Sequence, residues 1–190
     1  MGVLVVAQVR AVRRRYPHLQ LLGWPCDLEK AYKQVPGDPR QIKWIVIVVW
    51  SPRTLKPEYF VPMCQLFGGK SPPLNFARYA AWLCECAASL FALPASHCVD
   101  DIISVEPAPL AASGSLAFKI LCGVTDWTIS VTKSPPPADT FVVIGVELDL
   151  SCVPEDEAIL KVTGKRIVQL TKILKLIRST GKLGSGDAAS

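Results

Sequence analysis

The stretch His97-Cys98-Val99-Asp100-Asp101-Ile102-Ile103 places two neighbouring acids between two short apolar flanks. This pattern predicts a tight β-hairpin with Asp100 and Asp101 at its tip. Asp27 holds a comparable position, because it lies at the end of the mostly apolar residues 19–28, which predict a strand. Neighbouring strand ends can converge in a sheet, so these three carboxyl groups are candidates for a single site.

The three acids would form a cluster of carboxylates, which repel one another and are tolerated mainly where cations lie between them. Oxygen-only ligands select hard ions such as Mg²⁺, and two ions about 3.5–4 Å apart can serve in-line phosphoryl transfer. An Asp-Asp pair in a turn is, on its own, also typical of ordinary turn chemistry. The surrounding motifs therefore decide between a metal site and a plain turn.

The rest of the chain alternates predicted strands and helices, an order that indicates an α+β protein. Apolar, β-branched and aromatic stretches predict strands at residues 42–50, which should be buried, and at residues 59–66, 127–131, 141–148 and 159–162. Helices are expected at residues 74–93 and 110–123. Tryptophan is most simply a core residue, and this applies to Trp44, Trp50, Trp82 and Trp127.

Two segments are basic. Residues 164–179 combine apolar residues at helical spacing with several Lys and Arg residues, which predicts a basic amphipathic helix. A second basic patch, near the N-terminus, consists of Arg10, Arg13, Arg14 and Arg15. Either segment could contact phosphate or simply solvent.

Composition bounds the class of protein. The 190 residues are 50% hydrophobic and 19% charged, which excludes disorder over most of the chain. The formal net charge of +5 suits a polyanionic partner without requiring one. The 7 cysteines show no paired zinc-ligand spacing and favour a reducing, intracellular compartment, cytoplasmic or nuclear. No apolar stretch reaches the roughly 20 residues of a spanning helix, so no membrane span is expected.

Four motifs, in order, resemble those of reverse transcriptases. Residues 26–36 are similar to the first catalytic motif, an Asp followed by Ala-Tyr and a hydrophobic-Pro pair. Residues 65–73 resemble the second, a Phe-Gly loop followed by Ser and Pro, and residues 97–102 resemble the Tyr-x-Asp-Asp box. Residues 141–148 are similar to the later segment that grips the primer. The details look closest to retroelement polymerases, including those that carry a tyrosine recombinase.

The resemblance implies a polymerase palm, an antiparallel sheet backed by helices in a split β-α-β, ferredoxin-like arrangement. Residues 22–150 would form the palm, and residues 1–21 would be a remnant of the fingers. Residues 151–180 would begin the thumb with the basic helix, and residues 181–190 would be a flexible tail. The implied activity is RNA-directed DNA polymerisation, with an RNA or DNA template-primer and deoxynucleoside triphosphates as partners.

The resemblance also implies roles for individual residues. Two Mg²⁺ ions, for which Mn²⁺ can substitute, would be held by Asp27, Asp100 and Asp101. Lys133 would protonate pyrophosphate or bind its charge. Substrate would contact Tyr32, which crowds a sugar 2′-hydroxyl, and the loop residues Phe67, Gly68 and Lys70. The template-primer backbone would be tracked by Lys165, Arg166, Lys172 and Lys175.

Two departures from the motifs leave alternatives open. Cys98 stands where the family usually has Tyr, and the region before Leu19 is short for a set of fingers. One alternative is a catalytically inactive or fragmentary palm that only binds nucleic acid. The other is a template-independent nucleotidyltransferase, since metal-binding acids alone do not specify a template.

Overall fold

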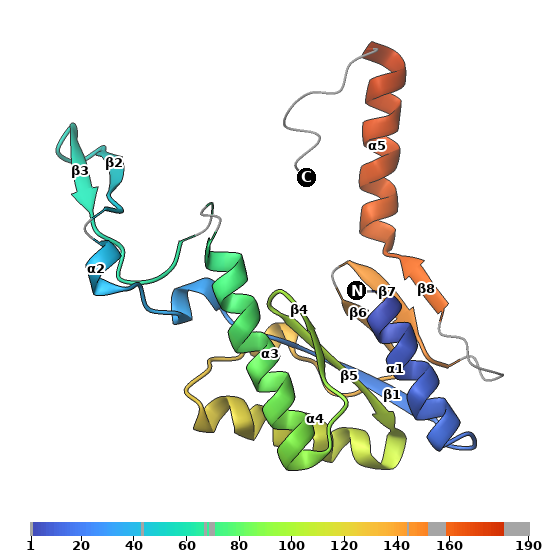
Figure 1. Ribbon diagram of the computed structural model, residues 1–190. Coiled ribbons are helices and arrows are strands. Elements are labelled where there is room, and N and C mark those ends of the chain that lie inside the picture. The colour runs from blue at the N-terminus through green and yellow to red at the C-terminus, as the bar shows by residue number, and fades with distance from the viewer. Residues whose placement is uncertain are drawn as a thin grey trace.

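A three-stranded antiparallel sheet organises the protein, in a computed structural model that describes residues 2–42, 44–66, 68, 71–143, 145–151 and 159–180 (Figure 1). β5 (Asp101–Pro107) lies between β1 (Leu21–Asp27) and β4 (Ser96–Cys98) and is antiparallel to both. β1 and β4 are therefore parallel to each other. Their connection passes through α3 (Ser71–Phe91), which makes a split β-α-β unit and confirms the α+β class.

One face of this sheet is covered by α3 and α4 (Ala108–Val124). Alternate strand residues point to this side, because successive side chains of a strand face opposite ways. Trp24 from β1 and Ile102 from β5 are fully buried here against Phe76 and Phe118 of the two helices. The rings of Trp24 and Phe118 lie with centroids 5.5 Å apart.

The opposite face of the sheet carries a second core, which includes Leu21, Ile103 and Val105. It is closed by α1 (Gly2–Arg15) and by the hairpin of β6 (Thr140–Val143) and β7 (Val146–Asp149). The sheet is thus covered on both faces, whereas the expected fold, a sheet backed by helices, did not include the covering by α1 and this hairpin. α1 covers the opposite face because one side of the helix is apolar. The Arg-rich end of the segment hides this apolar spacing in the sequence.

The basic patch expected near the N-terminus does not include Arg13. Its side chain is buried, and its guanidinium donates hydrogen bonds to the carbonyl oxygens of Leu19 (3.1 Å) and Leu150 (3.4 Å). These two bonds join α1 to the segment before β1 and to the segment after β7. Arg13 therefore serves the fold and is unavailable to phosphate.

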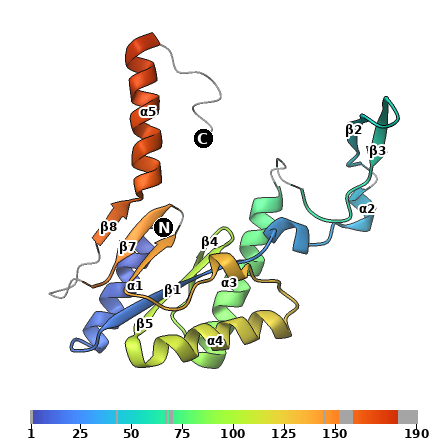
Figure 2. The same ribbon diagram turned by 180° about the vertical axis from the view of Figure 1, so that it is seen from behind.

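The predicted strand at residues 141–148 is two strands in the structure. β6 and β7 form a hairpin whose turn contains Gly145 in the left-handed region, at φ +67°, which favours glycine. β8 (Ile159–Val162) pairs with β7 and is followed by α5 (Gly164–Thr180), which agrees with the predicted strand and basic helix. α5 extends away from the central sheet (Figures 1 and 2).

The strand at residues 42–50 was expected to be buried, but β2 (Ile47–Ser51) is largely exposed and pairs with β3 (Lys56–Phe60) in a hairpin. It follows the short helices η1 (Ala31–Gln34) and α2 (Pro39–Ile42) and projects away from the body of the protein (Figure 2). Trp44 is 79% exposed and Trp50 63% exposed. No second layer covers this two-stranded sheet within the described residues, so its apolar sequence does not lead to burial.

Several other predicted elements change in detail. Trp82 is half exposed, whereas Trp127 packs against the first core as expected. The strand predicted at residues 127–131 does not form. Ile129 instead makes a single bridge with Leu28, and the short helix η2 (Val131–Lys133) follows. Among the described residues, no helix is long and apolar enough to cross a membrane.

A buried carboxyl group occupies the space beside one glycine of α4. Trp24 Nε1 donates to Glu106 Oε1 at 2.7 Å, and the Glu106 carboxyl group lies where a Cβ at Gly114 would stand. We expect Gly114→Ala to lower the free energy of unfolding by about 1–3 kcal/mol, because the carboxyl group must move in a packed core. Urea unfolding followed by circular dichroism measures this loss.

Gly123→Ala is the matched control in the same helix. Apart from its chain neighbours and the backbone of its own helix, no atom of the described residues lies within 4 Å of a Cβ at Gly123. The added methyl should raise the free energy of unfolding by about 0.4–1 kcal/mol through the lower entropy of the unfolded chain. Equal effects of the two substitutions would contradict the described packing.

Candidate functional site

The register of β1 on β5 places two acids side by side. Asp27, the last residue of β1, is the direct partner of Asp101, the first residue of β5. Directly opposed residues in an antiparallel pair have Cα atoms about 4.5–5.5 Å apart and side chains on the same face. The three predicted acids are thereby brought to one end of the sheet, since Asp100 immediately precedes Asp101.

The turn that carries Asp100 is tight. Cys98 of β4 pairs with Asp101 of β5, which leaves Val99 and Asp100 as the two linking residues. Val99 adopts a left-handed conformation, with φ of 58°. The tip of the hairpin is therefore Val99-Asp100, one residue earlier than predicted, and Asp101 belongs to the strand.

Asp27 is held by backbone hydrogen bonds to a segment far along the chain. Its amide donates to Ser134 Oγ (3.1 Å), and its carbonyl oxygen accepts from the amide of Ser130 (2.9 Å). Its side chain is only 11% exposed. Sequence reasoning missed both serines, because nothing in the Pro-rich stretch that follows indicates that it would pair with β1.

The same segment brings Lys133 to the acids. Its ammonium Nζ lies 3.3 Å from Asp27 Oδ1, while most of the lysine side chain remains exposed. An ion pair of this exposure contributes little to stability. Its position is informative, because it shows that a cation reaches the carboxylates from the solvent side. A hollow of about 470 Å³ opens beside Lys133 and Asp101.

The surroundings of Asp101 raise the pKa of its carboxyl group. Partial burial, the charge of Asp100 and the charge of Asp27 raise its pKa from 3.8 to about 6, although Lys133 acts in the opposite direction. The negative charges of the site are therefore only partly balanced by the protein. A cation bound among them would favour the ionised form of Asp101.

The donor chemistry of this end of the sheet fits a hard cation. Carboxylate oxygens are the ligands that Mg²⁺ prefers, and the Lys133 ammonium is a positive charge already attracted to Asp27. In this conformation, no three His, Cys, Asp or Glu side chains of the described residues are gathered closely enough to enclose a metal ion. A bound ion would compete with Lys133 for Asp27.

The predicted substrate residues are placed unevenly. Tyr32 is buried in η1, where its ring meets Phe76 edge-on at a centroid distance of 5.5 Å. Burial raises the pKa of the Tyr32 hydroxyl, and the negative charge of Asp100 raises it further. Gly68 has a φ of 94°, a backbone conformation that favours glycine. Phe67 and Lys70 lie outside the described residues.

The basic residues of α5 lie apart from the acids. Lys165, Arg166, Lys172 and Lys175 are all exposed on a helix that extends away from the sheet (Figure 1). The guanidinium of Arg166 covers Gly145 in the β6–β7 turn, which anchors the base of the helix. The apolar side of α5 is also exposed, with Ile167 at 53% and Leu174 at 64%.

The chain has no match among models of known protein families or among curated proteins. The resemblance to reverse transcriptases therefore remains an expectation from the four sequence motifs, to which the structure adds the spatial arrangement of their residues. That arrangement consists of the opposed pair Asp27 and Asp101, the adjoining Asp100 and the incoming Lys133.

The raised pKa of Asp101 predicts a pH-dependent stability. The folded protein holds the Asp101 proton more tightly than the unfolded chain does, so this group favours folding below about pH 4 and the benefit is lost as the pH rises through about 6. Asp101→Asn cannot ionise. Its melting temperature relative to the wild type should therefore increase between pH 4 and pH 7, as followed by circular dichroism.

Asp149→Asn is the control of opposite sign. Hydrogen bonds from Ser151 and Lys161 hold the pKa of Asp149 well below its usual value, so its charge stabilises the fold at neutral pH and not in acid. This variant should therefore lose a nearly constant amount of stability relative to the wild type between pH 4 and pH 7, and the loss should shrink only as the pH falls below about 4. A flat difference for Asp101→Asn across the same range would contradict the described electrostatics.

Proposed function

We propose that this chain is the palm of an RNA-directed DNA polymerase of a retroelement, which transfers nucleotides from deoxynucleoside triphosphates to a primer 3′-hydroxyl. The observation that carries the proposal is the direct pairing of Asp27 with Asp101, with Asp100 in the adjoining turn. These acids come from two motifs separated by more than 70 positions, and their order along the chain matches that of the polymerase motifs.

The strand order supports the proposal. Beyond β1, Ala138 forms a bridge with Gly23 through two backbone hydrogen bonds of 2.8 and 2.9 Å. The order across the sheet is thus the Ala138 segment, β1, β5 and β4, with α3 and α4 on one face. This is the ferredoxin-like order expected of a palm, in which the first and third strands are neighbours at the centre.

The residues of the site suit phosphoryl transfer. Asp27, Asp100 and Asp101 would hold the metal ions, and bound Mg²⁺ would supply a Lewis acid that lowers the pKa of the primer hydroxyl and stabilises the leaving pyrophosphate. Lys133 stands beside this charge with its ammonium exposed, where it can bind or protonate a phosphate oxygen. Tyr32 lies close enough to feel the charge of Asp100 and would limit the space at the sugar.

The test is primer extension on a primed RNA template with labelled deoxynucleotides and Mg²⁺ or Mn²⁺. We expect Asp100→Asn to abolish incorporation, because it removes one charge and a ligand oxygen without a change in size. Glu85→Gln is the matched control, since Glu85 is an exposed acid in the middle of α3. Incorporation that is unchanged in Asp100→Asn would refute the proposed chemistry.

A nucleic-acid-binding protein without polymerase activity is the second candidate. Cys98 in place of the motif Tyr and the ion pair of Lys133 with Asp27 favour it. Salt-sensitive binding with no incorporation by the folded wild type would identify this alternative. Incorporation that ignores the template sequence would indicate a template-independent nucleotidyltransferase instead.

The exposed lysines of α5 predict how binding depends on salt. Each phosphate contact that is lost should reduce the slope of log K against log salt by about 0.7 for a single strand and about 0.9 for a duplex. We therefore expect the double variant Lys165→Ala, Lys172→Ala to bind a template-primer with a shallower salt dependence. Fluorescence anisotropy between 50 and about 200 mM salt measures it, and an unchanged slope would exclude α5 from the interface.

A further inference from the structure

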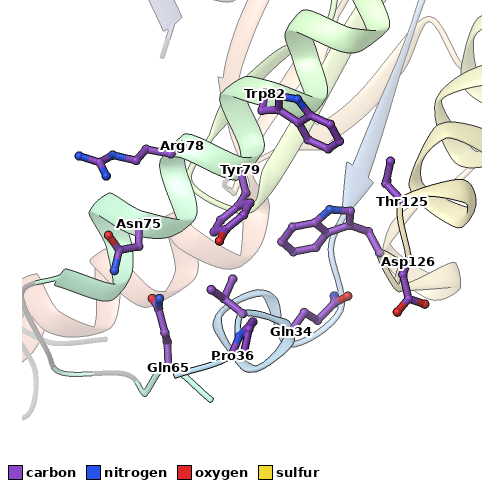
Figure 3. Close-up of a pocket in the computed structure, with 11 residues that line it drawn as sticks. Gln34, Pro36, Gln65, Asn75, Arg78, Tyr79, Trp82, Thr125 and Asp126 are labelled. Atoms are coloured by element: carbon purple, nitrogen blue, oxygen red, sulfur yellow. The ribbon is translucent and has the colours of Figure 1, made fainter. Parts of the chain in front are cut away.

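A cavity of about 820 Å³ lies between α3, η1 and the turn that follows α4 (Figure 3). None of the acids described above lines it, and neither does Lys133. We propose that this cavity binds a nucleotide, with its base against the aromatic side chains and its phosphate at Arg78. The proposal does not require the acids to be catalytic.

One face of α3 supplies a wall of the cavity. Asn75, Arg78, Tyr79 and Trp82 recur at the three- and four-residue spacing that places side chains on one side of a helix. Figure 3 shows the ring of Tyr79 extending from α3 toward Pro36 and the ring of Trp82 extending toward the side on which Thr125 lies. Their exposed fractions are 43% and 48%, so two large rings lie uncovered within a concave surface.

Trp127 completes the aromatic surface and is fixed in place. Its ring contacts Phe76 of the first core nearly perpendicularly, at 5.8 Å between centroids, and lies 5.7 Å from the ring of Tyr79. Its backbone amide donates to the Cys122 carbonyl oxygen at 2.8 Å. Rigid aromatic surfaces of this kind stack on nucleobases regardless of sequence, because every base has a π-face.

The floor of the cavity is already formed. Gln34 Nε2 donates to the carbonyl oxygens of Glu29 and Thr128, and its Oε1 accepts from the Thr128 amide at 2.7 Å. These bonds join η1 to the segment after α4. Both N–H groups of the Gln34 amide are thereby used, so a ligand acceptor must find its donors elsewhere in the cavity.

Gln65 offers such a partner. Its side chain lines the cavity, and its buried Oε1 has no hydrogen-bond partner among the residues that the structure describes. A buried acceptor left unpaired is costly, so a rotation of the Gln65 side chain that brings this oxygen to a ligand N–H in the cavity is favoured. Within the described part of the chain, the side chains of Asn75 and Arg78 also have no hydrogen-bond or ion-pair partner, and Figure 3 shows them extending from α3 at the same end.

The set of groups fits a nucleotide better than a neutral aromatic compound. Amide side chains match the donors and acceptors on a base edge, and a guanidinium is the preferred partner of a phosphate. Asp126 lies across the cavity from Arg78 (Figure 3), where its carboxylate can accept hydrogen bonds from sugar hydroxyls. The nucleotide could be free, or it could be an unpaired residue of a single strand.

The test compares adenosine, adenosine monophosphate and a short deoxyadenosine oligonucleotide as ligands of the full chain, by tryptophan fluorescence and calorimetry. We expect Arg78→Ala to weaken binding of the monophosphate roughly tenfold or more and of adenosine hardly at all, since only the monophosphate carries the charge. Arg53→Ala, at an exposed position of the β2–β3 turn, is the matched control and should change neither.

Gln65→Leu separates binding from folding. Because the substitution removes an unpaired buried acceptor, the melting temperature should stay the same or rise, whereas the affinity for the nucleotide should fall.

Binding of the monophosphate identifies a free nucleotide as the ligand, and Arg78-dependent binding of the oligonucleotide alone identifies a single strand. Equal binding of all three ligands by Arg78→Ala and wild type, or no binding at millimolar concentrations, would overturn the proposal. Asp100→Asn should bind as the wild type does, which distinguishes this site from the proposed polymerase site.

Discussion

The antiparallel pairing of β1 with β5 is the constraint on which the rest of the structure depends. Seven consecutive residue pairs, from Leu21 with Pro107 to Asp27 with Asp101, join the two strands. A shift of one residue would turn every side chain of one strand to the opposite face. Trp24 and Ile102 would then leave the core beneath α3 and α4, so the burial of these residues fixes the register.

That register has an electrostatic consequence at the end of the sheet. Once the apolar residues are in place, the last residue of β1 must lie opposite the first residue of β5, and both are aspartates. The mostly exposed Lys133 forms an ion pair with Asp27, and the pKa of Asp101 stays raised. Apolar packing elsewhere in the fold therefore maintains a local repulsion, as is common where charge is needed for binding or chemistry.

The short helix η1 lies between the two sites considered above. Its Tyr32 is buried against Phe76 and senses the charge of Asp100, whereas Gln34, two residues later, closes the floor of the large cavity. Phe76 also contacts Trp127 in the wall of that cavity. A substitution at Phe76 would thus disturb both places, whereas Asp100 and Arg78 belong to one each.

The sequence by itself determined the elements whose cause is local. The strand that ends at Asp27, the hairpin that carries Asp100, the long helix α3 and the basic helix α5 all follow from apolar spacing and turn residues. Only the tertiary structure decided the burial of Arg13 and the exposure of Trp44 and Trp50, because each depends on whether another segment covers the residue. The contact of Lys133 with Asp27 and the cavity beside α3 are likewise set by segments about 50 to more than 100 positions apart, whose meeting leaves no local signal in the sequence.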